Sequence, residues 1–257
     1  MVGPAKKRIL KCLLVIVAVL ALIPLRVSYI SKSSLTNPKS DVASDARGAE
    51  AWKKAMQGFQ AKPSTDATPI SFSIEDVNYS VPRNYILRMD NWNGGPQTIA
   101  VLKVTFPGFE PLTDKTTQCL TKPMAFWPKD CVPIEFTLIG KTPVSDDERF
   151  RNASTLFHSQ IPKPGPAGFE MYETGADNAR LETYRKVTAK HTLLIHCIIF
   201  PPKNNGEKWG TCSNESRLLD NNTLEYSFYL DQLGNAEQID NGLRNLVDSL
   251  TLTGGKQ

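Results

Sequence analysis

One apolar stretch near the N-terminus constrains this chain more than any other feature. Residues Cys12–Leu25 read CLLVIVAVLALIPL, and Ile9 and Leu10 lengthen the run across Lys11. Basic residues stand at positions 6, 7, 8 and 11, and no acidic residue occurs before Asp41. Because basic residues beside a span tend to stay in the cytoplasm, we expect a cytoplasmic tip at residues 1–8, a single transmembrane anchor at residues 9–30, and export of the rest.

The same stretch has alternative interpretations. A membrane span needs about 20 apolar residues, whereas a signal-peptide core has about 7–15. Residues 9–30 suffice for a span, but residues 12–25 alone suit a cleaved signal or a buried helix. The small residues of Ser31-Lys32-Ser33 lie far from the apolar core and form a poor cleavage site. The expectation is therefore an uncleaved anchor in the inner (plasma) membrane, with the main domain periplasmic or extracellular.

The charge of the chain is concentrated in the N-terminal segment. The formal net charge is +4, but residues 1–26 hold five of the 30 Lys and Arg and none of the 26 Asp and Glu. The remainder thus has 25 basic and 26 acidic residues and is almost neutral. Nucleic-acid binding needs a basic stripe or patch, so no nucleic-acid partner is expected.

The five cysteines divide into one inside the apolar run, Cys12, and four in the exported part. An even number in an oxidising compartment predicts two disulfides, with three possible connectivities. We expect Cys119–Cys131 and Cys197–Cys212. An antiparallel turn centred between Asn204 and Asn205 places residue 197 opposite residue 212. Four free thiols are the alternative, and a zinc site is disfavoured because no C-x₂-C pair occurs.

The hydrophobic pattern predicts an α+β exported domain at residues 69–253, after a linker or stalk at residues 31–68 that is helical in part. Short alternating runs, such as those at residues 70–74 and 77–81, are typical of strands joined by turns. Between Asn235 and Leu250 the apolar residues recur at helical spacing. We expect a mostly antiparallel sheet packed by this C-terminal helix.

The sequence shows no recognisable catalytic motif. Neither G-x-S-x-G, nor a Walker A loop, nor G-x-G-x-x-G is present. His191 and His196 are five apart on a predicted strand, so they point to opposite faces and do not share a metal there. The prediction is therefore no catalytic residue, no cofactor and no metal.

Three side chains are candidates for contact with a partner protein. They are Arg83, which follows Pro82 in a predicted turn, and the aromatic residues Trp92 and Trp127. Arg and Trp are enriched at binding hot spots. The alternative for Arg83 is a solvated turn residue or an ion pair with Asp90.

Four segments resemble an uncharacterised family of bacterial envelope proteins. They are Phe72–Val77, Val81–Tyr85, Gly94–Pro96 and Gly168–Glu173. The resemblance implies an inner-membrane anchor and one periplasmic domain, and it implies no activity.

These observations support two hypotheses from different classes. The leading one is a non-enzymatic, membrane-anchored module that binds another protein in the periplasm, as an immunity or accessory protein does. The alternative is a periplasmic enzyme, a hydrolase, whose site carries no recognisable motif. A deep pocket with convergent His, Asp, Glu or Ser side chains would favour the enzyme.

Overall fold

The computed structural model describes residues 59–122, 131–140, 144–176, 179–200, 208–218 and 222–252. The predicted anchor at residues 9–30 and the stalk up to residue 58 lie outside these ranges. Within them, no helix is both long and apolar enough to cross a membrane. The anchor therefore stays a prediction from the sequence.

The described residues form short strands with a few helices between and after them. In chain order the strands are β1 (Pro69–Ile74), β2 (Val77–Pro82), β3 (Ile86–Met89), β4 (Gly95–Gln97), β5 (Ile99–Phe106), β6 (Val132–Ile139), β7 (Lys163–Pro164), β8 (Glu170–Ala176), β9 (Ala179–Val187), β10 (Thr192–Phe200), β11 (Trp209–Arg217) and β12 (Thr223–Tyr229). The helices are α3 (Thr117–Thr121), α4 (Asp146–Ser154) and α5 (Ala236–Leu250), and the 3-10 turns are η1 (Arg83–Tyr85), η3 (Pro166–Gly168) and η4 (Leu230–Asn235).

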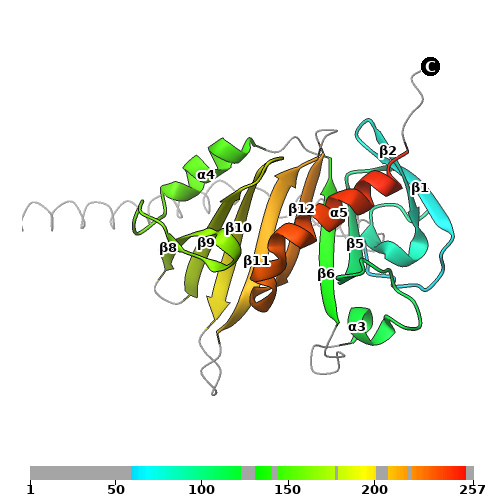
Figure 1. The fold of residues 1–257 in the computed structure, drawn as a ribbon. Coiled ribbons are helices and arrows are strands. Elements are labelled where there is room, and N and C mark those ends of the chain that lie inside the picture. The colour runs from blue at the N-terminus through cyan, green and yellow to red at the C-terminus, as the bar shows by residue number, and fades with distance from the viewer. Residues whose placement is uncertain are drawn as a thin grey trace, which may run out of the picture. The chain divides into compact units, whose positions relative to one another are not determined.

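The strands form one large antiparallel sheet and one small sheet (Figure 1). The large sheet has the order β3-β5-β6-β12-β11-β10-β9-β8-β7, and the small one has the order β2-β1-β4, with β1 and β4 parallel. After β6 the chain reaches the far edge of the large sheet and returns strand by strand until β12 pairs with β6. This path places α4, which lies between β6 and β7 in sequence, beside strands that follow it.

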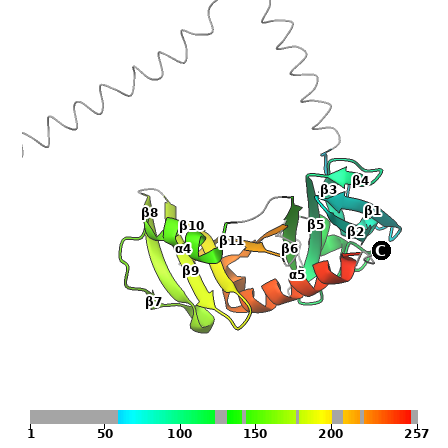
Figure 2. The same ribbon diagram turned by 90° about the horizontal axis from the view of Figure 1, so that it is seen from above.

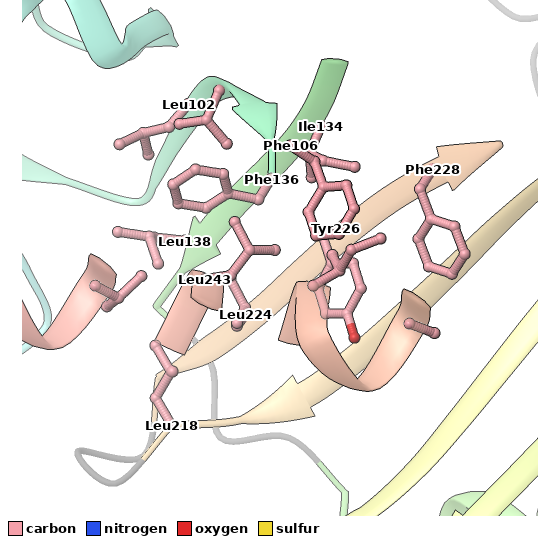
Figure 3. Close-up of a cluster of buried hydrophobic side chains, with 14 of the residues drawn as sticks. Leu102, Phe106, Ile134, Phe136, Leu138, Leu218, Leu224, Tyr226, Phe228 and Leu243 are labelled. Atoms are coloured by element: carbon pink, nitrogen blue, oxygen red, sulfur yellow. The ribbon is translucent and has the colours of Figure 1, made fainter. Parts of the chain in front are cut away.

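Helix α5 covers one face of the large sheet and forms the core with it (Figure 2). Its residues Ile239, Leu243, Val247 and Leu250 are buried, which matches the spacing seen in the sequence. Figure 3 shows Leu243 among the sheet residues Phe136, Leu138, Leu224, Tyr226 and Phe228. Full burial of one such side chain contributes about 1.5–3 kcal/mol. The predicted antiparallel sheet packed by a C-terminal helix is therefore confirmed.

Two segments differ from the sequence-based expectation. The sequence pattern predicts an irregular loop at Cys119–Pro133, but helix α3 occupies Thr117–Thr121, where threonine hydroxyls donate to backbone carbonyls. Thr117 Oγ1 donates to Thr113 O at 2.7 Å, and Thr121 Oγ1 donates to Thr117 O at 2.7 Å. Strand β11 extends to Arg217 despite its polar sequence, because it is hydrogen-bonded on both sides, to β10 and to β12.

Candidate functional site

The face of the large sheet opposite α5 is polar and largely open. On β10, Leu193, Ile195 and Cys197 are buried in the core, whereas His196 and Ile198 point the other way and stay exposed. The neighbouring strands continue this alternation, since successive side chains point to opposite faces. The open face therefore carries mainly short hydroxyl side chains, namely Thr137, Thr183, Thr211, Ser213 and Ser227.

Helix α4 builds a wall over part of this open face. Ser145 is followed three residues later by Glu148, a pattern that predicts a helix N-terminus, and Ser145 Oγ caps the helix by accepting a hydrogen bond from Glu148 N at 3.3 Å. Asp146 Oδ2 then accepts a hydrogen bond from Thr192 N at 3.1 Å, which fixes the start of the helix to β10. Further along, the Phe150 ring lies 5.5 Å from the Tyr172 ring between centroids. The helix is held at its first turn and by aromatic contacts, and none of its residues is fully buried.

Between α4 and the strands lies a groove with a cavity of about 950 Å³. Its lining comes from α4, β6 and β8–β12 and includes the hydroxyl side chains named above. Leu156, which follows α4, and Ile198 also line it, and both are exposed, by 69% and 43%. We call this cavity with its walls the open-face groove. It combines a polar floor with an exposed apolar rim.

The charges in the open-face groove are unevenly distributed. Glu215 and Glu225 stand directly opposite each other on β11 and β12. Glu135 lies nearby on β6, with its Oε1 atom 3.1 Å from Arg88 Nη2. Arg149 of α4 lies at the other side, near His196. The groove thus has an acidic side on β6, β11 and β12 and a basic side under α4.

His196 is the histidine that the groove contains. Its Nδ1 lies 3.1 Å from Thr183 Oγ1, which is buried. Partial desolvation in the groove lowers the pKa of His196 below its ordinary value, and the charge of Arg149 lowers it further, whereas Glu215 raises it. The imidazole is therefore mostly neutral at neutral pH.

Ser213 is the cross-strand neighbour of His196, but among the described residues no hydrogen bond joins the two side chains, as a nucleophile and its base require. Over the same ranges, no three His, Cys, Asp or Glu side chains come together as metal ligands. What the groove provides is hydrogen-bonding groups, a nearly buried guanidinium and apolar walls.

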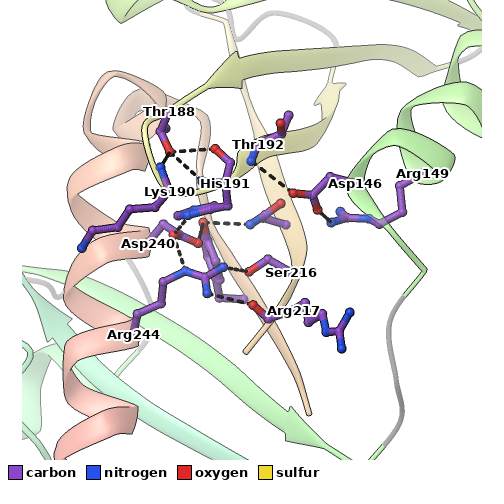
Figure 4. A network of polar contacts seen from close by, with 12 residues as sticks. Asp146, Arg149, Thr188, Lys190, His191, Thr192, Ser216, Arg217, Asp240 and Arg244 are labelled. Atoms are coloured by element: carbon purple, nitrogen blue, oxygen red, sulfur yellow. Dashed lines mark hydrogen bonds and ion pairs between the residues drawn. The ribbon is translucent and has the colours of Figure 1, made fainter. Parts of the chain in front are cut away.

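A second polar cluster lies on the other face of the sheet, under α5 (Figure 4). Asp240 is buried, and its carboxylate accepts hydrogen bonds from Tyr226 Oη at 3.0 Å and Arg244 Nε at 2.7 Å. His191 Nε2 lies 2.7 Å from Asp240 Oδ2. Arg244 also donates to Ser216 Oγ at 2.6 Å. These contacts tie α5 to β11, β12 and the turn before β10, so we assign this cluster a structural role.

Arg83 and Trp92, two of the predicted partner contacts, lie together in the structure. The Arg83 guanidinium carbon is 4.1 Å from the centroid of the Trp92 ring. Its Nη1 donates to Ile86 O at 2.7 Å and its Nη2 donates to Lys62 O. Asp90, considered as its ion-pair partner, instead accepts from Thr98 N at 2.7 Å. Arg83 thus holds residues before β1 against the domain, and contact with a partner stays a prediction. Trp127 lies outside the described residues.

Changing Arg83 to alanine separates these two roles. Arg83→Ala is expected to lower the free energy of unfolding by about 1–2 kcal/mol, because it removes two charge-assisted hydrogen bonds and a cation–π contact. Urea denaturation of the full chain in mild detergent measures this change. The matched control is Arg151→Ala on α4, an exposed arginine whose side chain makes no described contact. If both variants unfold like the parent protein, the intramolecular role is wrong and partner contact becomes the better interpretation.

Both expected disulfides are present, Cys119–Cys131 and Cys197–Cys212. Cys197 and Cys212 are register partners on β10 and β11, and both are buried against the core. Cys119 and Cys131 belong to a small separate cluster with Leu112 and Leu120. The Cys197–Cys212 bridge crosslinks the middle of the sheet under the open-face groove, and the Cys119–Cys131 bridge closes the segment around α3.

Sequence reasoning did not find Arg149 or the groove. Arg149 follows the acidic start of α4, and nothing in the local sequence indicates that its side chain enters a cavity. The sequence could have placed His196 beside Ser213, because the register that pairs Cys197 with Cys212 also puts these two residues opposite each other.

Comparisons with known proteins bear on the fold. No protein-family model matches the chain, and no curated protein matches its sequence. Among solved structures, the chain is similar to an immunity protein of the type IV secretion system of Stenotrophomonas maltophilia. The TM-score is 0.50 at 11% sequence identity, over 73% of this chain and 94% of that chain. At this identity the comparison shows a shared fold.

Proposed function

We propose that this chain is a membrane-anchored envelope protein whose exported domain binds another protein in the open-face groove, in the manner of an immunity or accessory protein. The observation that carries the proposal is the groove. Its cavity of about 950 Å³ has a polar floor and is bordered by exposed apolar residues. The shared fold with an immunity protein supports this class of function.

The groove has the composition of a recognition surface. Leu156 and Ile198 expose apolar area at it, one following α4 and one on β10. Exposed apolar residues that gather around a concave surface are typical of interaction sites. The short serine and threonine side chains of the floor leave room for side chains of a partner. The sheet beneath is crosslinked by Cys197–Cys212, so the groove needs little ordering when a partner binds.

The location follows from the proposed anchor. Residues 9–30 would hold the domain at the membrane, and an oxidising periplasm suits the two disulfides. Tethering raises the effective concentration of a binder at the surface where its partner arrives. For an immunity or accessory protein that acts beside the membrane, this tethering favours binding of the partner.

The test places a charge at the rim of the groove. A photo-crosslinking amino acid at Leu156 captures and identifies the partner in envelope preparations, and the purified partner is then titrated against the full chain. Ile198→Asp is expected to weaken this binding at least about tenfold, because a carboxylate would be desolvated at an apolar contact.

The matched control is Val187→Asp, which changes an exposed apolar residue of β9 that does not line the groove. It is expected to bind like the parent protein. Equal affinity of the Ile198→Asp variant and the parent, or equal weakening by both substitutions, contradicts the groove as the binding surface.

A further inference from the structure

Arg149 is the most unusual charged side chain of the open-face groove. Only 11% of its side chain is exposed, although α4 has no fully buried residue. Its ion pair with Asp146 is long, 3.6 Å between Nη1 and Oδ1, and within the described ranges Nη1 makes no hydrogen bond. A buried guanidinium with part of its donors unsatisfied is costly, so a feature of this kind calls for an explanation.

Asp146 satisfies Arg149 only in part, because it has a second function. Its Oδ2 atom accepts the backbone hydrogen bond from Thr192 N at 3.1 Å, and it lies in the first turn of α4. A carboxylate in the first turn is held there by the helix dipole. Asp146 therefore anchors the helix, and its Oδ1 atom, 3.6 Å from Arg149 Nη1, leaves that buried donor without a hydrogen bond among the described residues.

The surroundings of Arg149 within the groove suit an anion. His196 lines the same cavity as Arg149, close enough for both the charge of Arg149 and that of Glu215 to act on the pKa of its imidazole. Asn152, one turn further along α4, lines the same cavity, and so does Thr183. The opposing carboxylates Glu215 and Glu225 lie on β11 and β12, on the acidic side of the groove.

We propose that Arg149, together with His196 and Asn152, receives a carboxylate side chain, Asp or Glu, of the bound partner protein. A guanidinium matches a carboxylate through two parallel hydrogen bonds, and this geometry gives specificity as well as affinity. The source is a protein rather than a free acid because Leu156 and Ile198 expose apolar surface at the same groove. This inference rests on the proposed function and adds the chemistry that the partner presents.

The experiment uses two cyclic β-hairpin peptides as probes, one with Leu-Glu-Leu at its turn and one with Leu-Gln-Leu. Each is titrated calorimetrically into the full chain in mild detergent. We expect the Glu peptide to bind at least about tenfold more tightly, a typical size for a charge-assisted pair. The preference should vanish in Arg149→Met and persist in Arg151→Met, the exposed arginine two residues further along α4. Arg149→Lys keeps the charge and should therefore retain part of the preference for the Glu peptide. It replaces the Met variant in this comparison if that variant does not fold.

Equal binding of the two peptides, including no binding of either, overturns the inference, and so does a preference that survives in Arg149→Met. Displacement of the Glu peptide by sodium acetate at equal concentration overturns the assignment to a protein segment. If Ile198→Asp still weakens binding of the partner while the peptides bind equally, the proposed function stands and only the carboxylate assignment falls. If Ile198→Asp has no effect, the groove itself is the wrong surface.

Discussion

Replacing Asp240 by alanine is expected to lower the free energy of unfolding by about 3–5 kcal/mol, the range for removing one partner of a buried charged pair. The carboxylate is 1% exposed and joins His191, Arg244 and Tyr226. Without it, the guanidinium of Arg244 keeps Ser216 Oγ at 2.6 Å and Arg217 O at 2.8 Å but loses its counter-charge. Urea denaturation measures the change, and Asp248→Ala, an exposed aspartate on the same helix, is the control.

The same variant is expected to change the response to acid. Burial raises the pKa of Asp240, but the contacts with His191 and Arg244 outweigh it, so the pKa lies below the ordinary value of 3.8. A carboxyl group with a lowered pKa in the folded state contributes stability above its unfolded pKa and loses it as the pH falls through the folded pKa. Parent stability should therefore fall below about pH 4, and Asp240→Ala should show less of this fall. Parallel acid profiles for the two proteins would contradict the assignment.

The sequence predicted α5 but not the role of Asp240. The apolar spacing of Ile239, Leu243 and Val247 depends on the helix alone, so it is visible in the sequence. Asp240 is buried because β12 and the turn before β10 supply its partners, and those segments meet α5 only in the folded chain. Asp240 and Arg244 are four residues apart, a spacing that permits the intrahelical pair seen in the structure, but spacing alone says nothing about burial.

The sequence did not predict the open-face groove, for a similar reason. The hairpin register that pairs Cys197 with Cys212 follows from one local turn, and it was predicted correctly. The groove instead needs β12 beside β6, more than 80 residues earlier in the chain, and α4 folded back over β8–β10. No periodicity within a short window encodes such pairings. The contact of Arg83 with Lys62 O could not be predicted for the same reason, because it depends on how the chain before β1 lies against the domain.

Removing the central disulfide is the second large change that the fold allows. Cys197→Ala combined with Cys212→Ala is expected to lower the free energy of unfolding by about 3 kcal/mol, the loop-entropy value for a bridge closing about 15 residues. Both side chains are buried in the core, so a small additional loss from packing is expected. The measurement is urea denaturation of the variant beside the parent protein without reductant.

The control is the corresponding double alanine variant of Cys119 and Cys131. That bridge lies in a separate small cluster with Leu112 and Leu120, so its loss is expected to loosen residues around α3 and leave the large sheet paired.

The two variants should also differ in their affinity for the partner. Cys197 lies between His196 and Ile198, and Cys212 lies between Thr211 and Ser213, so the central bridge fixes the residues that form the floor and rim of the open-face groove. Partner affinity should therefore fall when the central bridge is removed and stay unchanged when the other is removed. Equal affinity in both variants would mean that the hydrogen bonds of the sheet hold the groove without the bridge.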